Sequence, residues 1–225
     1  MEITNNPYKI TGGIYLVLNP AIDESTLLTK LKSALLGGLQ VVQIWNNWQP
    51  GADKPVLIEK IAALCKPYQV PLLINQDWVL LRDIPALHGI HFDAVPASLS
   101  LIRDAVNRPF ITGITCSGSL DTVAWAEDNG LDYVSFCSMF PSSSASSCDI
   151  VTPLTVRRAR VLTAMPIFVA GGITLQNIAG LKKLTPFDGV AVISGIMSAD
   201  DPEQKVKQFK NAVSANPTQH ATQND

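Results

Sequence analysis

The sequence predicts a (β/α)8 barrel, the TIM-barrel form of the α/β class, built as a single domain. Its 225 residues suit one domain and are too few for two ordinary ones. A short apolar run followed by a segment of helical period recurs eight times, which is the pattern of a parallel sheet covered by helices. Eight such units within about 200 residues favour a closed barrel over an open doubly wound sheet.

The expected strands are continuous apolar runs, as strands of a parallel sheet buried on both faces require. β-branched and aromatic residues are frequent in them, and turn residues bound them. In chain order the strands are expected at Gly13–Leu18, Val41–Trp45, Pro71–Asn75, Gly89–Phe92, Phe110–Thr115, Tyr133–Cys137, Pro166–Ala170 and Gly189–Ile193.

Each expected helix follows a polar turn. Ser25 and Ser119 are predicted to cap the first and fifth helices, because a serine oxygen accepts from the N–H groups of a first turn. In chain order the helices are expected at Ser25–Leu36, Pro55–Cys65, Trp78–Asp83, Ser98–Val106, Ser119–Gly130, Pro153–Leu162, Thr174–Leu184 and Pro202–Val213. The barrel should therefore cover residues 13–214, between an N-terminal extension (1–12) and a polar tail (215–225) that we expect to be disordered.

Composition and charge exclude several classes of protein. With 47% hydrophobic and 16% charged residues, the chain can build a large core and is not extensively disordered. Seventeen Lys and Arg against nineteen Asp and Glu leave a net charge of -2, so no nucleic-acid or membrane partner is expected. No apolar run approaches the roughly 20 residues of a membrane span. The first residues, MEITNNP, have neither the basic region nor the apolar stretch of a signal peptide, so none is expected. We expect a cytoplasmic protein, for which a homodimer is left open.

Two glycine-bearing loops indicate a phosphate site. In a barrel of this kind the functional loops follow the strands, and phosphate sites are common after the seventh and eighth. Gly171 and Gly172 follow the seventh expected strand, and Ser194 and Gly195 follow the eighth. Backbone N–H groups at the start of a helix suit a phosphate. The alternative is that the glycine pair only makes a tight turn.

The chain resembles the thiamine phosphate synthase and thiazole tautomerase superfamily from Gly13 to about Ala212. The matching pieces keep the family's order and spacing, with PIFVAGGIT and FDGVAVISGIM the most specific pair. The others are IYLVLNP, ALLGGLQVVQ, PLLIN, GIH, GIT and DYVSFCSMFPSSS. Within them, VVQ and FPSSS distinguish this family from other phosphate-binding barrels, many of which carry a glycine pair after the seventh strand. The fold implied by the resemblance is the same barrel.

The resemblance implies an activity and a set of ligand-binding residues. Enzymes of this family join a pyrimidine methyl diphosphate to a thiazole phosphate and release diphosphate, with magnesium and cations assisting the leaving group. Magnesium would be a cofactor here only if that reaction is retained; no other cofactor is expected. The expected partner is a small phosphorylated heterocycle. Residues implied to bind it are Gly171, Gly172, Ile193, Ser194, Ser142, Ser144, Gln43 and Asn75.

The sequence departs from the family where charge is needed. In the family's QLREK segment the arginine is Trp45 here and the lysine is Asn47. The aspartate of IND is Gln76, that of HLGQxD is Pro96, and the lysine of TxTK is Ala145. We therefore expect a divergent member whose thiazole-phosphate half is retained and whose diphosphate and magnesium half is degenerate.

Neighbouring groups leave alternatives open. Asp77 and Asp93 are candidates to replace the lost metal carboxylates, although Asp77 also suits the N-cap of the short third helix. His91 and Ser138 are the candidate catalytic residues of a thiazole tautomerase-type isomerase, which needs an acid or base but no diphosphate site. For His91 a structural role is the alternative. A third hypothesis is a non-catalytic barrel that binds a phosphorylated ligand.

Overall fold

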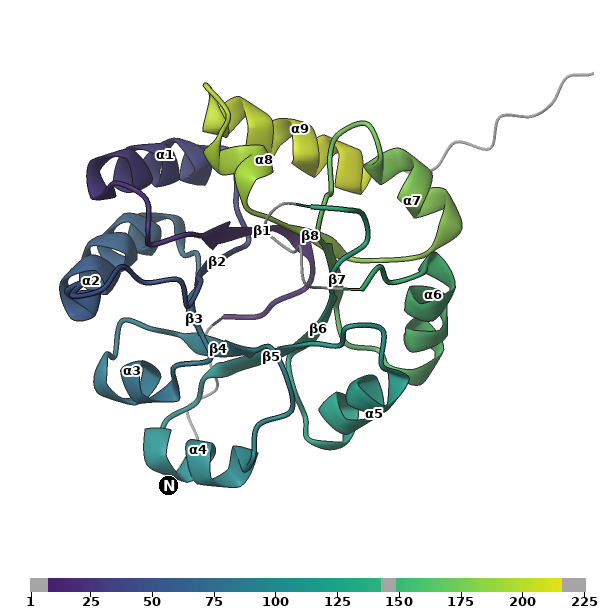
Figure 1. Cartoon of the computed structure of the whole chain (residues 1–225), viewed down its shortest axis with the longest axis horizontal. Coiled ribbons are helices and arrows are strands. Elements are labelled where there is room, and N and C mark those ends of the chain that lie inside the picture. Colours follow the sequence, from purple (N-terminus) through teal and green to yellow (C-terminus); the bar gives the residue numbers. More distant parts are fainter. Residues whose placement is uncertain (1–7, 143–148, 216–225) are drawn as a thin grey trace, which may run out of the picture.

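The computed structural model describes residues 8–142 and 149–215 and contains a closed barrel of eight parallel strands. The strands follow one another around the barrel in chain order, and the helices form an outer ring around them (Figure 1). This confirms the predicted single-domain (β/α)8 barrel. No helix in the described part of the chain is long and apolar enough to cross a bilayer.

The elements alternate along the chain. The strands are β1 (Gly13–Leu18), β2 (Val41–Ile44), β3 (Leu72–Asn75), β4 (Gly89–Phe92), β5 (Ile111–Thr115), β6 (Tyr133–Phe136), β7 (Ile167–Ala170) and β8 (Gly189–Val192). The helices are α1 (Glu24–Leu36), α2 (Lys54–Cys65), η1 (Lys66–Tyr68), α3 (Trp78–Asp83), α4 (Leu99–Val106), α5 (Leu120–Asp128), α6 (Pro153–Leu162), α7 (Ile178–Leu184), α8 (Ser194–Met197) and α9 (Pro202–Ser214).

Helix starts show where local sequence signals were sufficient. Ser119 caps α5 as predicted, because its side chain accepts from the Thr122 N–H. The prediction of Ser25 as the cap of α1 is wrong: the helix starts at Glu24, and the Asp23 side chain accepts from the Thr26 N–H. An aspartate two residues earlier competes for the same role, and its charge also favours a helix N-terminus.

Two later helices also differ from expectation. α7 starts at Ile178 rather than Thr174, because residues 174–177 form a separate turn. In that turn the Thr174 N–H donates to Asn177 Oδ1, and the Asn177 N–H donates to Thr174 Oγ1. α8 is a single extra turn after β8, where the sequence indicated only a connection to the last helix.

Two apolar layers hold the barrel together. One packs the outer face of the sheet against the helices, and the other fills the barrel interior. The interior layer consists of Ile10, Tyr15, Val41, Leu73, Ile111, Tyr133 and Phe168. Gly113 makes room for the Tyr133 ring: a Cβ at this position would lie 2.0 Å from Tyr133 Cζ. An inward-facing glycine therefore lets a large ring cross the interior.

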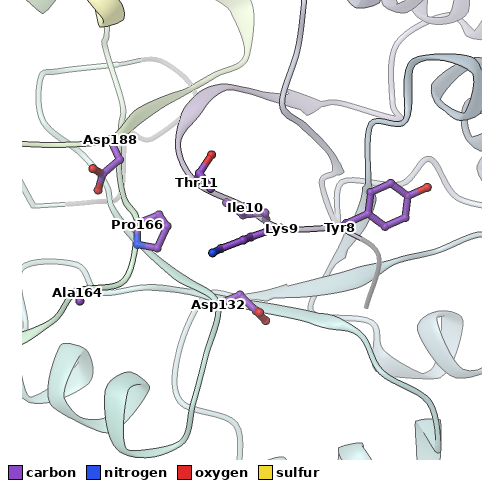
Figure 2. Close-up of a pocket in the computed structure, with 8 residues that line it drawn as sticks. All are labelled: Tyr8, Lys9, Ile10, Thr11, Asp132, Ala164, Pro166 and Asp188. Atoms are coloured by element: carbon purple, nitrogen blue, oxygen red, sulfur yellow. The ribbon is translucent and has the colours of Figure 1, made fainter. Parts of the chain in front are cut away.

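The N-terminal end of the barrel carries a cavity of about 360 Å³ (Figure 2). Its carboxylates are already bonded. Asp188 accepts from the Ile167 N–H at 2.7 Å and from Arg160 at 2.6 Å. Asp132 accepts from both the N–H and the hydroxyl of Thr112. These bonds tie strand starts together, which suits a stabilising face rather than a reactive one.

Candidate functional site

The floor of the barrel mouth is polar but uncharged. Side chains that face the interior near the carboxyl ends of the strands are Gln43, Asn75, His91, Thr115 and Ser135. Gln43, Asn75, His91 and Ser135 are all less than 7% exposed, so these groups have little contact with water. Buried polar groups need hydrogen-bond partners, and these partners organise the floor.

A chain of hydrogen bonds crosses the barrel below the mouth. The Tyr15 hydroxyl donates to Gln43 Oε1 at 2.5 Å and lies 2.8 Å from the Tyr133 hydroxyl. The Tyr133 hydroxyl lies 2.9 Å from His91 Nδ1, and His91 Nε2 lies 2.9 Å from Thr115 Oγ1. The chain therefore links five strands, β2, β1, β6, β4 and β5, in that order.

Burial keeps the titratable members of this chain neutral. It lowers the pKa of His91 to about 4, although the negative charge of Asp93 acts in the opposite direction. Burial also raises the pKa values of Tyr15 and Tyr133 above their usual range. Imidazole and both phenols are thus uncharged at neutral pH.

A second polar cluster lies beside the floor, where β3 and β4 end. The Asp93 carboxylate accepts from Asn75 Nδ2 at 2.8 Å and from Gln76 Nε2 at 3.0 Å. Asn75 Oδ1 in turn accepts from the Asn46 N–H at 3.3 Å. Both oxygens of Asp93 are therefore bonded to side-chain amides.

Asp77 has a different environment from Asp93. Its side chain accepts from the Leu80 N–H, so it caps α3 as predicted. The same carboxylate lies 3.4 Å from Lys54 Nζ on α2, and that ammonium group lies 5.5 Å from the centre of the Trp48 ring. Asp77 thus connects α3 to α2.

The glycine pair after β7 packs against the loop after β6. Gly171 and Gly172 have φ values of +80° and +63°, which favour glycine. A Cβ on Gly171 would lie 2.0 Å from Ser138 Oγ, and one on Gly172 would lie 2.7 Å from Phe140 Cβ. The tight turn is therefore real. Because β7 and β8 are neighbours, this turn and the exposed Ser194 lie on the same side of the mouth.

Comparisons with known proteins decide the family. A family model described as thiamine monophosphate synthase matches residues 14–196. The thiamine-phosphate synthase of Thiobacillus denitrificans is 30% identical over 206 residues, which cover 92% of this chain and 97% of that protein. That of Methylobacillus flagellatus is 32% identical over 197 residues, covering 88% and 93%. The chain belongs to the thiamine monophosphate synthase family.

Solved structures agree in fold. A thiamine phosphate pyrophosphorylase from Pyrococcus furiosus superimposes with a TM-score of 0.75 at 20% identity, covering 89% of this chain and 95% of that one. Orotidine 5'-phosphate decarboxylase from Pyrococcus horikoshii gives a TM-score of 0.65 at 13% identity, covering 89% and 100%. At these identities the likeness is one of barrel architecture.

Uncharged residues occupy the positions where the resemblance led us to expect charged ones. Trp45 and Pro96 are half-buried. Asn47 Nδ2 donates to Asn19 Oδ1 at 3.0 Å and so joins the loops after β1 and β2. Gln76 donates to Asp93. Ser144 and Ala145 lie outside the described residues, whereas Ser142 is half-buried.

Among the described residues, the carboxylates beside the floor are not gathered as the magnesium implied by the family resemblance requires. Magnesium requires several oxygen ligands, with one or two carboxylates among them. Asp93 has both oxygens bonded to amide N–H groups, and Asp77 caps α3. Within residues 8–142 and 149–215 no three His, Cys, Asp or Glu side chains gather as metal ligands would.

The candidate proton-transfer groups are also already bonded. Both ring nitrogens of His91 have partners, and the Ser138 hydroxyl donates to the Phe140 carbonyl at 2.7 Å. Sequence reasoning missed Tyr15, Tyr133 and Thr115, which complete the hydrogen-bond chain. The inward positions of these three follow from strand alternation, but the register that brings them together does not.

Proposed function

We propose that this protein binds a thiazole phosphate-type heterocycle at its barrel mouth and has lost the diphosphate and magnesium half of the family's site. The observation that carries this proposal is the uncharged floor, with amides, hydroxyls and a neutral imidazole. A leaving diphosphate needs cationic partners and a metal. Efficient coupling of hydroxymethylpyrimidine diphosphate to thiazole phosphate is therefore not expected.

The loops after β7 and β8 support binding of a single phosphate group. Their backbone approaches the mouth without bulky side chains at Gly171, Gly172 and Gly195, and Ser194 adds an exposed hydroxyl. Backbone N–H groups with a hydroxyl can bind one phosphate without a full positive charge. Gln43 offers a neutral amide for the attached ring, whereas the Asn75 amide already donates to Asp93 and to the His91 carbonyl and accepts from the Asn46 N–H.

Lys54, a cation near the floor of the mouth, does not replace the missing cationic groups. Lys54 lies beside the polar cluster at the ends of β3 and β4, but it is already placed between the Asp77 carboxylate and the Trp48 ring. Moving its ammonium group to a diphosphate would break both contacts. This supports loss of the diphosphate half rather than its relocation to Lys54.

A thiazole tautomerase-type reaction is less well supported than binding alone. Proton transfer needs a group with an accessible site and a pKa near the working pH. His91 has both nitrogens bonded and a pKa lowered to about 4 by burial, while the Ser138 hydroxyl donates to a carbonyl. Neither residue has the properties of a proton-transfer group.

The test combines turnover and binding. The protein is incubated with hydroxymethylpyrimidine diphosphate, thiazole phosphate and magnesium, and binding of thiazole phosphate is measured by calorimetry. We expect binding with little or no thiamine phosphate formed. Coupling at family-like rates would contradict the proposal, as would the absence of thiazole phosphate binding.

A matched pair of variants locates the phosphate. Gly172→Asp is unsuitable because any Cβ would lie 2.7 Å from Phe140 Cβ. Ser194→Asp instead adds a negative charge at an exposed position of the mouth and should weaken thiazole phosphate binding at least about tenfold. Gly180→Asp on α7 is the control, because a Cβ there meets nothing within 4 Å. Equal affinity in both variants would contradict this placement.

A further inference from the structure

The atom of the Gln43 amide that faces Tyr15 sets the direction of the whole hydrogen-bond chain below the mouth. The chain runs Gln43–Tyr15–Tyr133–His91–Thr115, with every link between 2.5 and 2.9 Å. Each hydroxyl has one proton to donate, and a neutral imidazole has one N–H. If one end of such a chain is fixed, the direction of every other bond follows.

The Gln43 carbonyl fixes that end. Gln43 Oε1 can only accept, so Tyr15 donates its proton to it. The Tyr15 oxygen can then bond to Tyr133 only by accepting the Tyr133 proton. The Tyr133 oxygen must in turn accept from His91, which places the imidazole proton on Nδ1.

The other end follows from the same count. With its proton on Nδ1, His91 has an unprotonated Nε2, which accepts from the Thr115 hydroxyl. Thr115 is half-buried, and its hydroxyl therefore presents only oxygen lone pairs toward the mouth of the barrel. The low pKa of His91 and the raised pKa values of both tyrosines keep this arrangement intact at neutral pH.

The second polar atom of the Gln43 amide remains available. Gln43 Nε2 has no acceptor among residues 8–142 and 149–215. Among these residues, the buried side-chain atoms without a hydrogen-bond partner are Trp48 Nε1 and Thr185 Oγ1. Gln43 Nε2 is not among them, so it is not fully buried. Because Oε1 points to Tyr15, the amide N–H₂ group is the part of Gln43 that solvent or a ligand reaches.

We propose that Tyr15 and Tyr133 are positioning residues that hold the Gln43 amide with its N–H₂ group toward the ligand and hold His91 as the Nδ1–H tautomer. The ligand must then offer a hydrogen-bond acceptor at the β2 side of the mouth. At the β5 side, Thr115 recognises a donor. This assignment rests on the proposed ligand site for its functional meaning, but the proton arrangement can be tested without any ligand.

The direct test is the tautomer of His91 in the wild-type protein. Long-range ¹⁵N–¹H correlation of the imidazole ring distinguishes an Nδ1–H from an Nε2–H tautomer. We expect Nδ1–H. If the Gln43 amide were turned over, every bond in the chain would reverse, and the spectrum would show Nε2–H. That single result would overturn the proposal.

Two variants should move the proton on His91 without touching it. In Tyr15→Phe, Tyr133 loses the oxygen that takes its proton, so it donates to His91 Nδ1 and the ring becomes Nε2–H. In Gln43→Leu, the Tyr15 proton turns to Tyr133 with the same final result. If one of these variants fails to fold, the other tests the same step, and the wild-type tautomer remains decisive.

Two controls separate this effect from loss of packing. Phe168→Leu disturbs the ring that packs edge-on against both Tyr15 and Tyr133, yet removes no hydroxyl. Thr115→Val removes the partner of Nε2 but leaves the other links. Both should keep the Nδ1–H tautomer. A tautomer change in Phe168→Leu, or none in Tyr15→Phe, would contradict the positioning role.

Binding measurements connect the chain to the site. Tyr15→Phe frees the Gln43 amide to turn and should weaken thiazole phosphate binding about three- to tenfold, the range for one neutral hydrogen bond. Phe168→Leu should bind within about twofold of wild type. If wild type binds no thiazole phosphate but the tautomers behave as stated, the proposed function fails and the positioning role stands. Unchanged binding in Tyr15→Phe would overturn the role toward the ligand.

Discussion

At the residue scale, the buried polar side chains at the floor of the mouth are uncharged. The resemblance to the family places Gln76 at an aspartate position and Asp93 at a glycine position, and the Gln76 amide donates to Asp93. The Asp93 carboxylate therefore has hydrogen-bond donors from both Asn75 and Gln76. Each of these oxygens keeps a further lone pair, so the two bonds fix the orientation of the Asp93 carboxylate rather than use up its capacity to accept.

His91 should make the protein sensitive to mild acid. Its folded-state pKa, about 4, is below the ordinary value of 6.5, so between these values the unfolded chain binds more protons. The contribution of neutral His91 to the stability of the fold is therefore present above pH 6.5 and is lost as the pH decreases toward 4. From pH 7 to pH 5 we expect this residue alone to reduce the free energy of unfolding by about 2 kcal/mol.

Urea unfolding of wild type and His91→Gln at both pH values measures this contribution. Glutamine does not titrate, so the variant should lose less stability between pH 7 and pH 5. His88, whose pKa burial also lowers, is present in both proteins and cancels in the comparison. Parallel pH dependence in the two proteins would show that His91 is not held neutral by burial.

At the scale of elements, the sequence predicted existence and order better than boundaries. Strands β1 and β4 match their expected ranges, because turn residues bound each apolar run. The start of α1 was missed because two capping residues, Asp23 and Ser25, compete within one turn. The start of α7 was missed because Thr174 and Asn177 bond to each other's backbone and form a turn of their own.

The candidate site was also predictable only in part, because its contacts join strands that are distant in the sequence. Motif spacing located Gln43, Asn75 and His91 at strand ends, because parallel strands present their carboxyl ends on one face. The partners Tyr15 and Tyr133 come from strands 118 positions apart, and their contact depends on the barrel closing. Glycine at position 113 provides the space, and no local pattern announces it.

The role of Asp77 can be tested through the helix that it caps. α3 has only six residues, so loss of its N-cap in Asp77→Ala should cost about 1 kcal/mol of stability. Asp77→Asn keeps a capping oxygen and loses only the contact with Lys54, which is partly exposed and should contribute little. Thermal unfolding of both variants measures the difference.

The asparagine variant also separates capping from metal binding. If Asp77 only caps α3, Asp77→Asn should match wild type in stability and in thiazole phosphate binding. Loss of a magnesium-dependent activity in this variant, with stability unchanged, would instead identify Asp77 as a metal ligand.

At the scale of the whole molecule, the two ends of the barrel differ in how they use charge. At the N-terminal end, the Asp188 carboxylate pairs with Arg160 and accepts from the Ile167 N–H at the start of β7. The Asp132 carboxylate accepts from the Thr112 N–H in β5. At the carboxyl end, the floor is neutral, and the described charged groups beside it, Lys54, Asp77 and Asp93, are engaged with one another or with amides. The fold is that of the family, and we propose that the reactive end has lost the charges that the diphosphate half needs. Chemistry and stability occupy different faces of this barrel, so one can change without the other.

This separation predicts that the missing charges can be restored together. Trp45→Arg, Asn47→Lys, Gln76→Asp, Pro96→Asp and Ala145→Lys return the family's groups to a barrel that already folds. Single changes should barely help. Gln76→Asp alone puts a second carboxylate beside Asp93 and removes a hydrogen-bond donor, and Asn47→Lys alone breaks the bond to Asn19. Without their partners these groups add repulsion or lose contacts.

In the combined variant the cations, the carboxylates and the metal act on one leaving group, so their effects depend on each other. Each charge-assisted contact contributes about 1.5–3 kcal/mol, and several together should raise magnesium-dependent thiamine phosphate formation roughly a hundredfold or more over wild type. Omitting magnesium should abolish this gain, which distinguishes it from nonspecific attraction of anions to added lysine and arginine. High activity in wild type, with no gain in the combined variant, would mean that Asp93, Lys54 or another group already supplies the charge and that the neutral floor does not limit the reaction.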